Sequence, residues 1–193
     1  MALHRKIAPA LTPVTLAEAK LHCTANDFTD DDAMLGIYIS AATARLDGLG
    51  ILGRCLISQT WELYYDTFPC GNLQIPLGKL ISVASVEYID PTTLSYVAWD
   101  PANYDVDLFS DDGWIVPVDT WPTIADSINA VRVTFTAGYG DAPSDVPDSI
   151  RVAILMMVAN WYANRETVVV GSTVSTLPLG AEDLLAPYRR VGF

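Results

Sequence analysis

The chain has 193 residues, of which 51% are hydrophobic and 18% charged, and its formal net charge is -12. This length fits one domain or one domain with a large insertion, and the apolar content excludes a disordered acidic chain. The excess of acidic residues repels phosphate backbones, which argues against nucleic-acid binding by the surface as a whole. A mean hydropathy of +0.27 is high for a monomer and predicts oligomerisation.

Two helices are predicted in the N-terminal helical part, residues 1–55. Thr15 and Glu18 have capping-box spacing, in which two side chains satisfy backbone donors at a helix start, and they predict a short helix to about Cys23. Three aspartates at 30–32 suit the first turn of a second helix, because the positive end of the helix dipole favours carboxylates. The positions predicted for the apolar side of the second helix are Met34, Leu35, Tyr38, Ala41, Ala42, Leu46 and, through its apolar stem, Arg45.

A β-rich insertion is predicted over residues 56–140. The sequence there consists of short β-branched and aromatic runs, separated by Pro, Gly, Asn and Asp residues that tolerate turn geometry. Short strands joined by such turns indicate a compact antiparallel module. The predicted strands are 58–66, 71–75, 81–89, 104–106, 114–116 and 131–136.

Helical structure is predicted again in residues 141–167. Pro147 suits a first helical turn, and the residues after it are apolar on every side of a helix, so this helix must be surrounded by other structure. The apolar stretch 150–162 is shorter than the about 20 residues that span a bilayer, so no membrane anchor is predicted. Residues 168–193 are interpreted as an extended C-terminal tail that is too short for a core of its own.

The predicted fold class is α+β. The N-terminal helices plus the C-terminal helix form a small helical bundle, the antiparallel β module is inserted into this bundle, and the extended tail follows it. The apolar residues of the tail need another surface, which makes the tail a candidate assembly element.

The sequence contains no pattern typical of an enzyme or of a metal site. Cys23, Cys55 and Cys70 include no C-x-x-C pair and indicate free thiols in a reducing compartment. Cys23 follows His22, but neighbouring side chains on a helix point about 100 degrees apart and cannot act as a pair. No catalytic residue, cofactor or metal is therefore predicted.

Acidic residues in the β-rich insertion offer an alternative, an enzyme or a Ca²⁺ loop. Paired carboxylates can serve acid-base chemistry, and hard cations take several oxygen ligands on a tight turn. These residues lie among turn residues and lack EF-hand spacing, so solvated loop charge is the interpretation that the pattern favours. They are Asp105, Asp107, Asp111 and Asp112.

Three tryptophans of the insertion offer another alternative function. Aromatic side chains on a β layer can form a platform that binds a glycan or a peptide. Aromatics are more often part of a core, so their exposure distinguishes the two cases. The three residues are Trp99, Trp114 and Trp121.

Several sequence phrases, taken in order, resemble the phage head-tail connector (adaptor) family, including its gene-transfer-agent members. The likeness covers nearly the whole chain, and the order of the phrases is more specific than any one of them. The phrases are LAEAK at 16–20, LISQTW at 56–61, IPLGKLISV at 75–83, VRVTFTAGYG at 131–140, VP at 146–147, WY at 161–162, NRE at 164–166 and LLAPYRR at 184–190.

The resemblance implies a structural protein without catalysis. It implies a dodecameric ring beneath the portal protein of a tailed phage or phage-like particle, with a stopper or tail protein below. The resemblance also implies that DNA passes through the channel of this ring without specific binding. Assembly in the bacterial cytoplasm and a final location in the particle neck are also implied. An alternative position is that of a neck stopper or tail-completion protein.

The C-terminal segment is the part expected to bind the portal or a neighbouring subunit. Its apolar residues lack a core of their own, and its two adjacent arginines can pair with acidic groups of a partner. The expected partner-binding residues are Leu177, Leu179, Leu184, Leu185, Tyr188, Arg189, Arg190 and Phe193.

Overall fold

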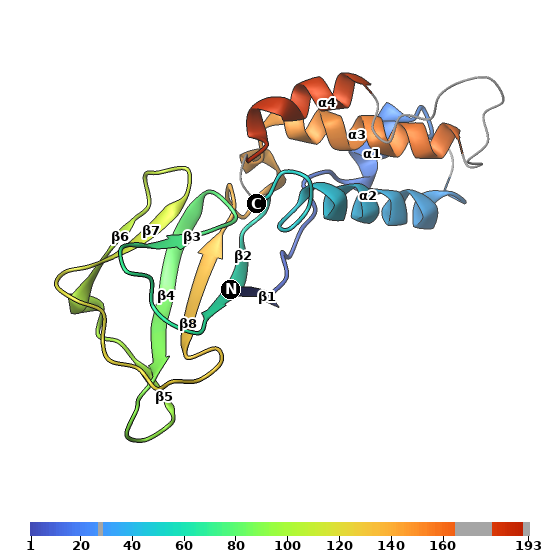
Figure 1. Cartoon of the computed structure of the whole chain (residues 1–193). Helices are drawn as coiled ribbons and strands as arrows, with labels where there is room; N and C mark the ends of the chain where they lie inside the picture. Colours follow the sequence, from blue (N-terminus) through green and yellow to red (C-terminus); the bar gives the residue numbers. More distant parts are fainter. Residues whose placement is uncertain (27–28, 165–178, 191–193) are drawn as a thin grey trace. The chain divides into compact units, whose positions relative to one another are not determined.

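The chain forms two compact units (Figure 1). The computed structural model describes residues 1–26, 29–164 and 179–190. Unit 1 is drawn from residues 1–9 and 58–139, and unit 2 from 10–57 and 140–193. The described residues contain helices and antiparallel sheets, which confirms the α+β class. Among them, no helix has the length and apolar character needed to cross a membrane.

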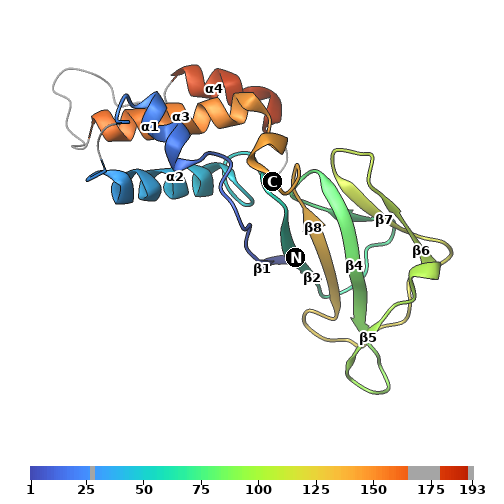
Figure 2. The ribbon, with the colours of Figure 1, turned by 180° about the vertical axis from the view of Figure 1, so that it is seen from behind.

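Unit 1 is the β module. Its larger sheet has five antiparallel strands in the order β1-β2-β8-β4-β5, and a second sheet has the order β3-β7-β6 (Figures 1 and 2). The first sheet consists of β1 (Ala2–Ile7), β2 (Gln59–Tyr65), β4 (Leu80–Ile89), β5 (Tyr96–Ala98) and β8 (Val131–Ala137). The second consists of β3 (Leu73–Ile75), β6 (Tyr104–Asp107), preceded by the 3-10 turn Pro101–Asn103, and β7 (Gly113–Pro117).

The centre of the large sheet holds the core of unit 1. In the register of β2 with β8, Trp61 is opposite Phe135 and Leu63 is opposite Val133. All four side chains are buried. Alternate residues of a strand lie on one face, so these cross-strand pairs form one apolar layer. The six predicted strands are confirmed, with ends that differ by one or two residues.

Strand β1 was not predicted, because residues 1–55 were assigned to the N-terminal helical part and no strand was expected there. The residues of β1 pair with β2 instead, and His4 is opposite Glu62. β1 is an edge strand with mostly exposed side chains, so it lacks the apolar alternation that identifies a half-buried strand. The three-residue strand β5 was missed for a related reason, since it is the opposite edge and too short to show a period.

Glu62 binds the edge strand β1 to the sheet. Its carboxylate lies 2.8 Å from Lys6 Nζ and accepts a 2.7 Å hydrogen bond from the Tyr64 hydroxyl. The hydrogen bond from Lys6 and then that from Tyr64 hold the pKa of Glu62 below its ordinary value of 4.5. Because this pKa is lower in the folded than in the unfolded chain, the ionised carboxylate stabilises the fold at pH values above the unfolded-state pKa. This stabilisation is lost as the pH falls through the folded-state pKa.

We therefore expect Glu62→Gln to lower the stability of unit 1 by about 1 kcal/mol at neutral pH. The difference from the wild type should shrink as the pH falls below 4.5, because the wild-type carboxylate then takes up a proton. Thermal unfolding followed by tryptophan fluorescence at a series of pH values measures this difference. A gap that stays constant with pH would contradict the assignment.

Unit 2 is the helical bundle. The capping box predicted for the first helix is present, because the Thr15 hydroxyl accepts from Glu18 N at 3.2 Å and Thr15 N donates to Glu18 Oε2 at 2.7 Å. This hydrogen bond from Thr15 N is the main cause of a lowered pKa at Glu18, which also pairs with Arg151. The helices are α1 (Leu16–His22), α2 (Asp32–Leu46), α3 (Asp148–Ala163) and α4 (Leu179–Leu185), with 3-10 turns at Pro143–Asp145 and Ala186–Tyr188.

Helices α2 and α3 supply a large part of the core of unit 2. On α3 the buried residues lie along one side, and the helix contacts α1, α2 and α4, so the prediction that other structure surrounds it is confirmed. On α2 the predicted stripe is partly wrong, because Met34 and Ala41 are exposed and Ile39 is buried. Apolar residues occur on every side of α2, so its sequence does not define which side packs. The buried residues are Leu35, Ile39, Ala42, Thr43 and Leu46 on α2 and Ile150, Ala153, Ile154, Met157 and Val158 on α3.

The C-terminal segment differs from the extended tail that was predicted. Residues 179–185 form α4, which packs against α3 within unit 2. Helices this short are marginal alone and form when a packing partner stabilises them. The partner is α3, so the helix depends on a tertiary contact that the local sequence does not reveal.

Candidate assembly segment at the C-terminus

Helix α4 is anchored by small and apolar residues that face α3. Ala181 is fully buried and Leu185 is 1% exposed. At Gly180 the backbone approaches α3 so closely that an added Cβ would lie 2.9 Å from Met156 Cε. The segment is therefore attached to the bundle by its own core residues.

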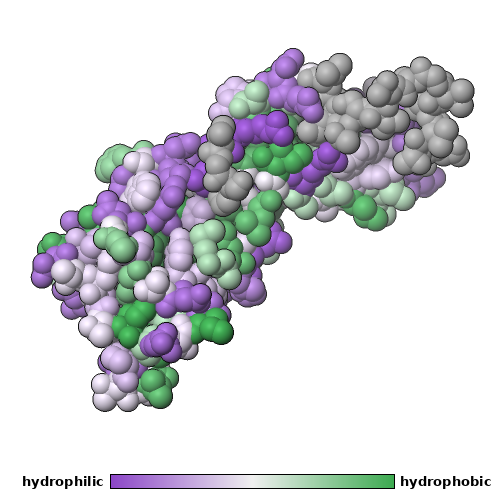
Figure 3. Space-filling model, in the orientation of Figure 1, coloured by the Kyte–Doolittle hydropathy of each residue, from purple (hydrophilic) through white to green (hydrophobic). Residues whose placement is uncertain are grey.

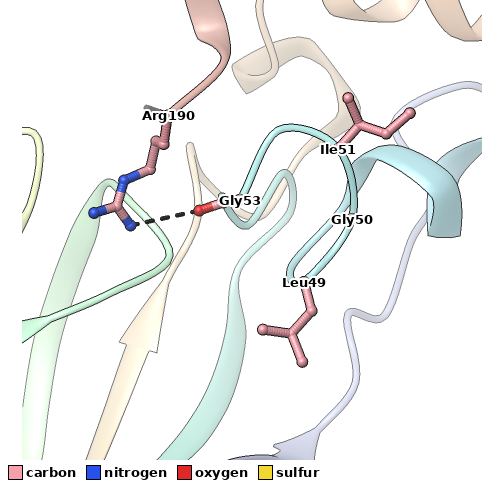
Figure 4. Close-up of a pocket in the computed structure, with 5 residues that line it drawn as sticks. All are labelled: Leu49, Gly50, Ile51, Gly53 and Arg190. Atoms are coloured by element: carbon pink, nitrogen blue, oxygen red, sulfur yellow. Dashed lines mark hydrogen bonds between the residues drawn. The ribbon is translucent and has the colours of Figure 1, made fainter. Parts of the chain in front are cut away.

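The residues after α4 are attached to the loop that follows α2. Arg189 N donates to Ala186 O at 3.4 Å and closes a 3-10 turn. Arg190 N donates to Leu52 O at 3.2 Å, and its Nη1 donates to Gly53 O at 3.5 Å (Figure 4). These contacts fix the path of the chain as far as Arg190.

The loop after α2 is held by its own buried hydrogen bonds. The Asp47 carboxylate accepts from Leu56 N at 2.8 Å, and Gly48 N donates to Arg54 O at 2.9 Å. Gly53, which receives the arginine, has a φ of 63°, a left-handed conformation that glycine adopts without strain. The loop therefore presents a fixed backbone carbonyl to Arg190.

A small pocket lies between this loop and Arg190 (Figure 4). Its volume is about 240 Å³. Pockets for small ligands usually measure about 300 to 1,000 Å³, so this one suits a single side chain of a partner better than a metabolite. It is lined by Leu49, Gly50, Ile51, Gly53 and Arg190.

The structure separates the expected partner-binding residues into anchors and accessible groups. Leu185 is a core residue, so it is not available to a partner. Arg190 is half-buried and bonded to the loop of its own unit. Arg189 is exposed, and Leu184 and Tyr188 are half-buried. Leu177 and Phe193 lie outside the described residues, as does the side chain of Leu179.

The structure describes the surroundings of Asp107 and Cys23, two of the residues that were considered for chemistry. Asp107 accepts hydrogen bonds from Phe109 N at 2.8 Å and from the Ser110 hydroxyl, so it stabilises its own turn. Burial raises the pKa of the Cys23 thiol, which is opposite to the change that activates a nucleophile. Among the described residues, no group of three or more His, Cys, Asp or Glu side chains is placed to hold a metal ion.

The three tryptophans do not form one open platform. Trp99 is 8% exposed, and its ring centroid lies 5.2 Å from those of both Tyr104 and Trp121. Trp121 stacks on Phe68 at 4.4 Å and donates to a backbone carbonyl. Trp114 is half-buried in β7. The aromatic residues therefore contribute mainly to the core of unit 1.

A family model matches a part of the chain that contains most of this segment. A family model described as "Phage gp6-like head-tail connector protein" matches residues 123–189, which include β8, α3 and α4. The C-terminal third of the chain matches the phage head-tail connector family. This match confirms the resemblance inferred from the sequence over the residues that it covers. No protein of the curated set matches the chain.

Solved structures of gene transfer agent (GTA) particles have the same fold. A chain from the neck of an empty GTA particle, computed with C6 symmetry, superposes with a TM-score of 0.81 and 24% identity. Chains from the virion of the native particle and from its neck computed with C12 symmetry give TM-scores of 0.79 and 0.75, each at 22% identity. Each alignment covers 100% of this chain and 97% of the other.

Proposed function

We propose that the chain is a structural head-to-tail connector subunit in the neck of a tailed phage or a phage-like particle. The match of residues 123–189 to the head-tail connector family is the observation that supports this function most directly. The fold supports it as well, because chains from GTA particle necks superpose over the whole length of this chain. Joining two parts of a particle requires no catalytic group, so the proposed role is not enzymatic.

The proposed arrangement is a ring beneath the portal protein, with a stopper or tail protein on the other side and DNA passing through the centre. The C6 and C12 symmetry of the similar necks supports a cyclic assembly, and twelve copies would suit the second of these. The net charge of -12 suits a passage that does not retain DNA, since like charges repel phosphates. The cysteines of the described residues form no disulfide bond, which is compatible with assembly in a reducing cytoplasm.

The accessible side chains of the C-terminal segment are proposed to contact the portal protein. Tyr188 offers an amphipathic ring, and Arg189 offers donors for acidic groups. Tyrosine and arginine are enriched among residues that dominate interface energies. Their position is fixed from both sides, by α4 before them and by the bonds of Arg190 after them.

A paired substitution tests this contact. We expect Tyr188→Ala with Arg189→Ala to weaken portal binding about 30-fold or more, because a loss of 2 kcal/mol is typical of such residues. Binding of the purified chain to its portal ring measures this effect, and the yield of particles with joined tails gives a second readout. If the double variant has a lower melting temperature than the wild type, the binding measurement uses Arg189→Ala alone.

The matched control is Glu182→Ala with Asp183→Ala, two exposed substitutions on the neighbouring helix. This control should bind the portal ring as the wild type does. Equal binding by all variants would refute the role of Tyr188 and Arg189. A wild-type chain that binds an isolated tail and not the portal ring would instead place it as a stopper or tail-completion protein.

A further inference from the structure

The solvent-facing side of α2 carries no charge. Of the residues on this helix, Met34 is 42% exposed and Ile37 is 60% exposed, although both are large and apolar. The opposite side of α2 packs within unit 2 and has its own buried residues. All exposed residues of α2 are apolar or neutral, namely Ala33, Met34, Ile37, Ser40, Ala41 and Ala44, and we call them the α2 face.

The α2 face is one continuous surface. With 3.6 residues per turn, its six positions lie within an arc of about 120° and extend over about 16 Å. The two charged residues of α2 are not part of it, since Asp32 and Arg45 are both half-buried. Asp32 pairs with Lys20 of α1 at 2.6 Å. Figure 3 shows apolar and neutral surface along the edge of unit 2 where Figure 1 draws α2.

Such a face is unexpected for a helix whose outer side contacts only water. A surface helix normally has charged and polar residues on the side opposite to its buried stripe. This chain has 34 charged residues among 193, yet none occupies the exposed side of α2. An exposed apolar surface of this kind marks a site of protein contact.

The charge of the chain indicates which protein covers the face. Two copies with a net charge of -12 each repel one another, so a close contact between them is favoured where the contacting surface carries no carboxylate. The α2 face fulfils this condition. Its alanines and serine also allow a neighbouring backbone to come close, while Met34 and Ile37 supply side chains that fill grooves.

We propose that the α2 face is the surface through which each subunit contacts the next copy of the chain. This inference rests on the proposed function, because a cyclic neck supplies the neighbouring copies. In a cyclic ring with more than two members, a surface meets a different surface of its neighbour. The α2 face of one copy therefore packs against a part of the next copy other than its own α2 face.

Site-specific photo-cross-linking tests the identity of the neighbour. A photoreactive phenylalanine analogue replaces Ile37 in the full chain, and assembled particles are irradiated. The expected adduct has about twice the 21.0 kDa mass of the chain and joins residue 37 to another region of a second copy. An adduct with a different protein, an adduct only between two residues 37, or no adduct would overturn the proposal. The same analogue at Ile128, which is 79% exposed in unit 1, is the control and should give no such product.

A charge substitution gives a second readout. Ile37→Glu should fold with the melting temperature of the wild type, because the side chain is exposed, but its incorporation into necks should fall at least about tenfold. Ile128→Glu should be incorporated normally. Normal incorporation of Ile37→Glu would overturn the α2 contact and leave the proposed function intact. Absence of the wild-type chain from particle necks would instead refute the proposed function.

Discussion

Ile154→Asp is expected to unfold the helical bundle. Ile154 is fully buried on α3, the helix that α1, α2 and α4 all contact. The substitution removes an apolar side chain, which costs about 2 to 5 kcal/mol, and places a carboxylate in a position without access to water, which adds several more. The sum is comparable with the about 5 to 15 kcal/mol of a whole domain. Circular dichroism should therefore show loss of helix at room temperature.

Val152→Asp is the matched control on the same helix. Val152 is 42% exposed, so the new carboxylate stays hydrated and the change in stability should remain within about 1 kcal/mol. The damage from Ile154→Asp should lessen in acid, because a buried carboxyl takes up a proton instead of remaining charged. Cooperative unfolding of Ile154→Asp close to the wild-type temperature would show that α3 is not the centre of the core.

Much of this fold could be predicted where the local sequence carries a specific signal. The capping pair Thr15 and Glu18, the β-branched and aromatic runs of β2 and β8, and Pro147 before a long apolar run are signals of this kind, and all three elements are present. The errors occur where that signal is absent. Both sides of α2 are apolar, so its buried side depends on where α3 lies.

In the candidate assembly segment, too, some features could be predicted from the local sequence and others could not. Tyr188 and Arg189 could be proposed from the sequence, because a short segment with an aromatic residue and adjacent arginines lacks a core of its own. The burial of Leu185 could not, since it depends on α3, about 30 residues earlier in the chain. The bond from Arg190 to Gly53 joins residues 137 positions apart, and no local pattern encodes such a contact.

Leu185→Ala is expected to release α4 from the bundle. Truncation of a buried leucine leaves a cavity and costs about 2 to 5 kcal/mol, and a helix as short as α4 has little stability without its packing partner. The loss appears first as local undocking, so amide hydrogen exchange within 181–188 should accelerate by about 30-fold or more, the equivalent of 2 kcal/mol. Exchange in the β module should be unchanged.

Leu184→Ala distinguishes docking from loss of helix propensity. Leu184 is the neighbouring residue of the same type and is only half-buried, so its truncation should accelerate exchange much less than that of Leu185. Equal acceleration by both variants would contradict the packing of α4 through Leu185.

Deletion of the segment is a weaker experiment, since it removes Tyr188 and Arg189 and also uncovers the surface of α3 around Met156. Comparing Leu185→Ala with the Tyr188 and Arg189 substitutions therefore separates the anchoring of the segment from its contact with a partner.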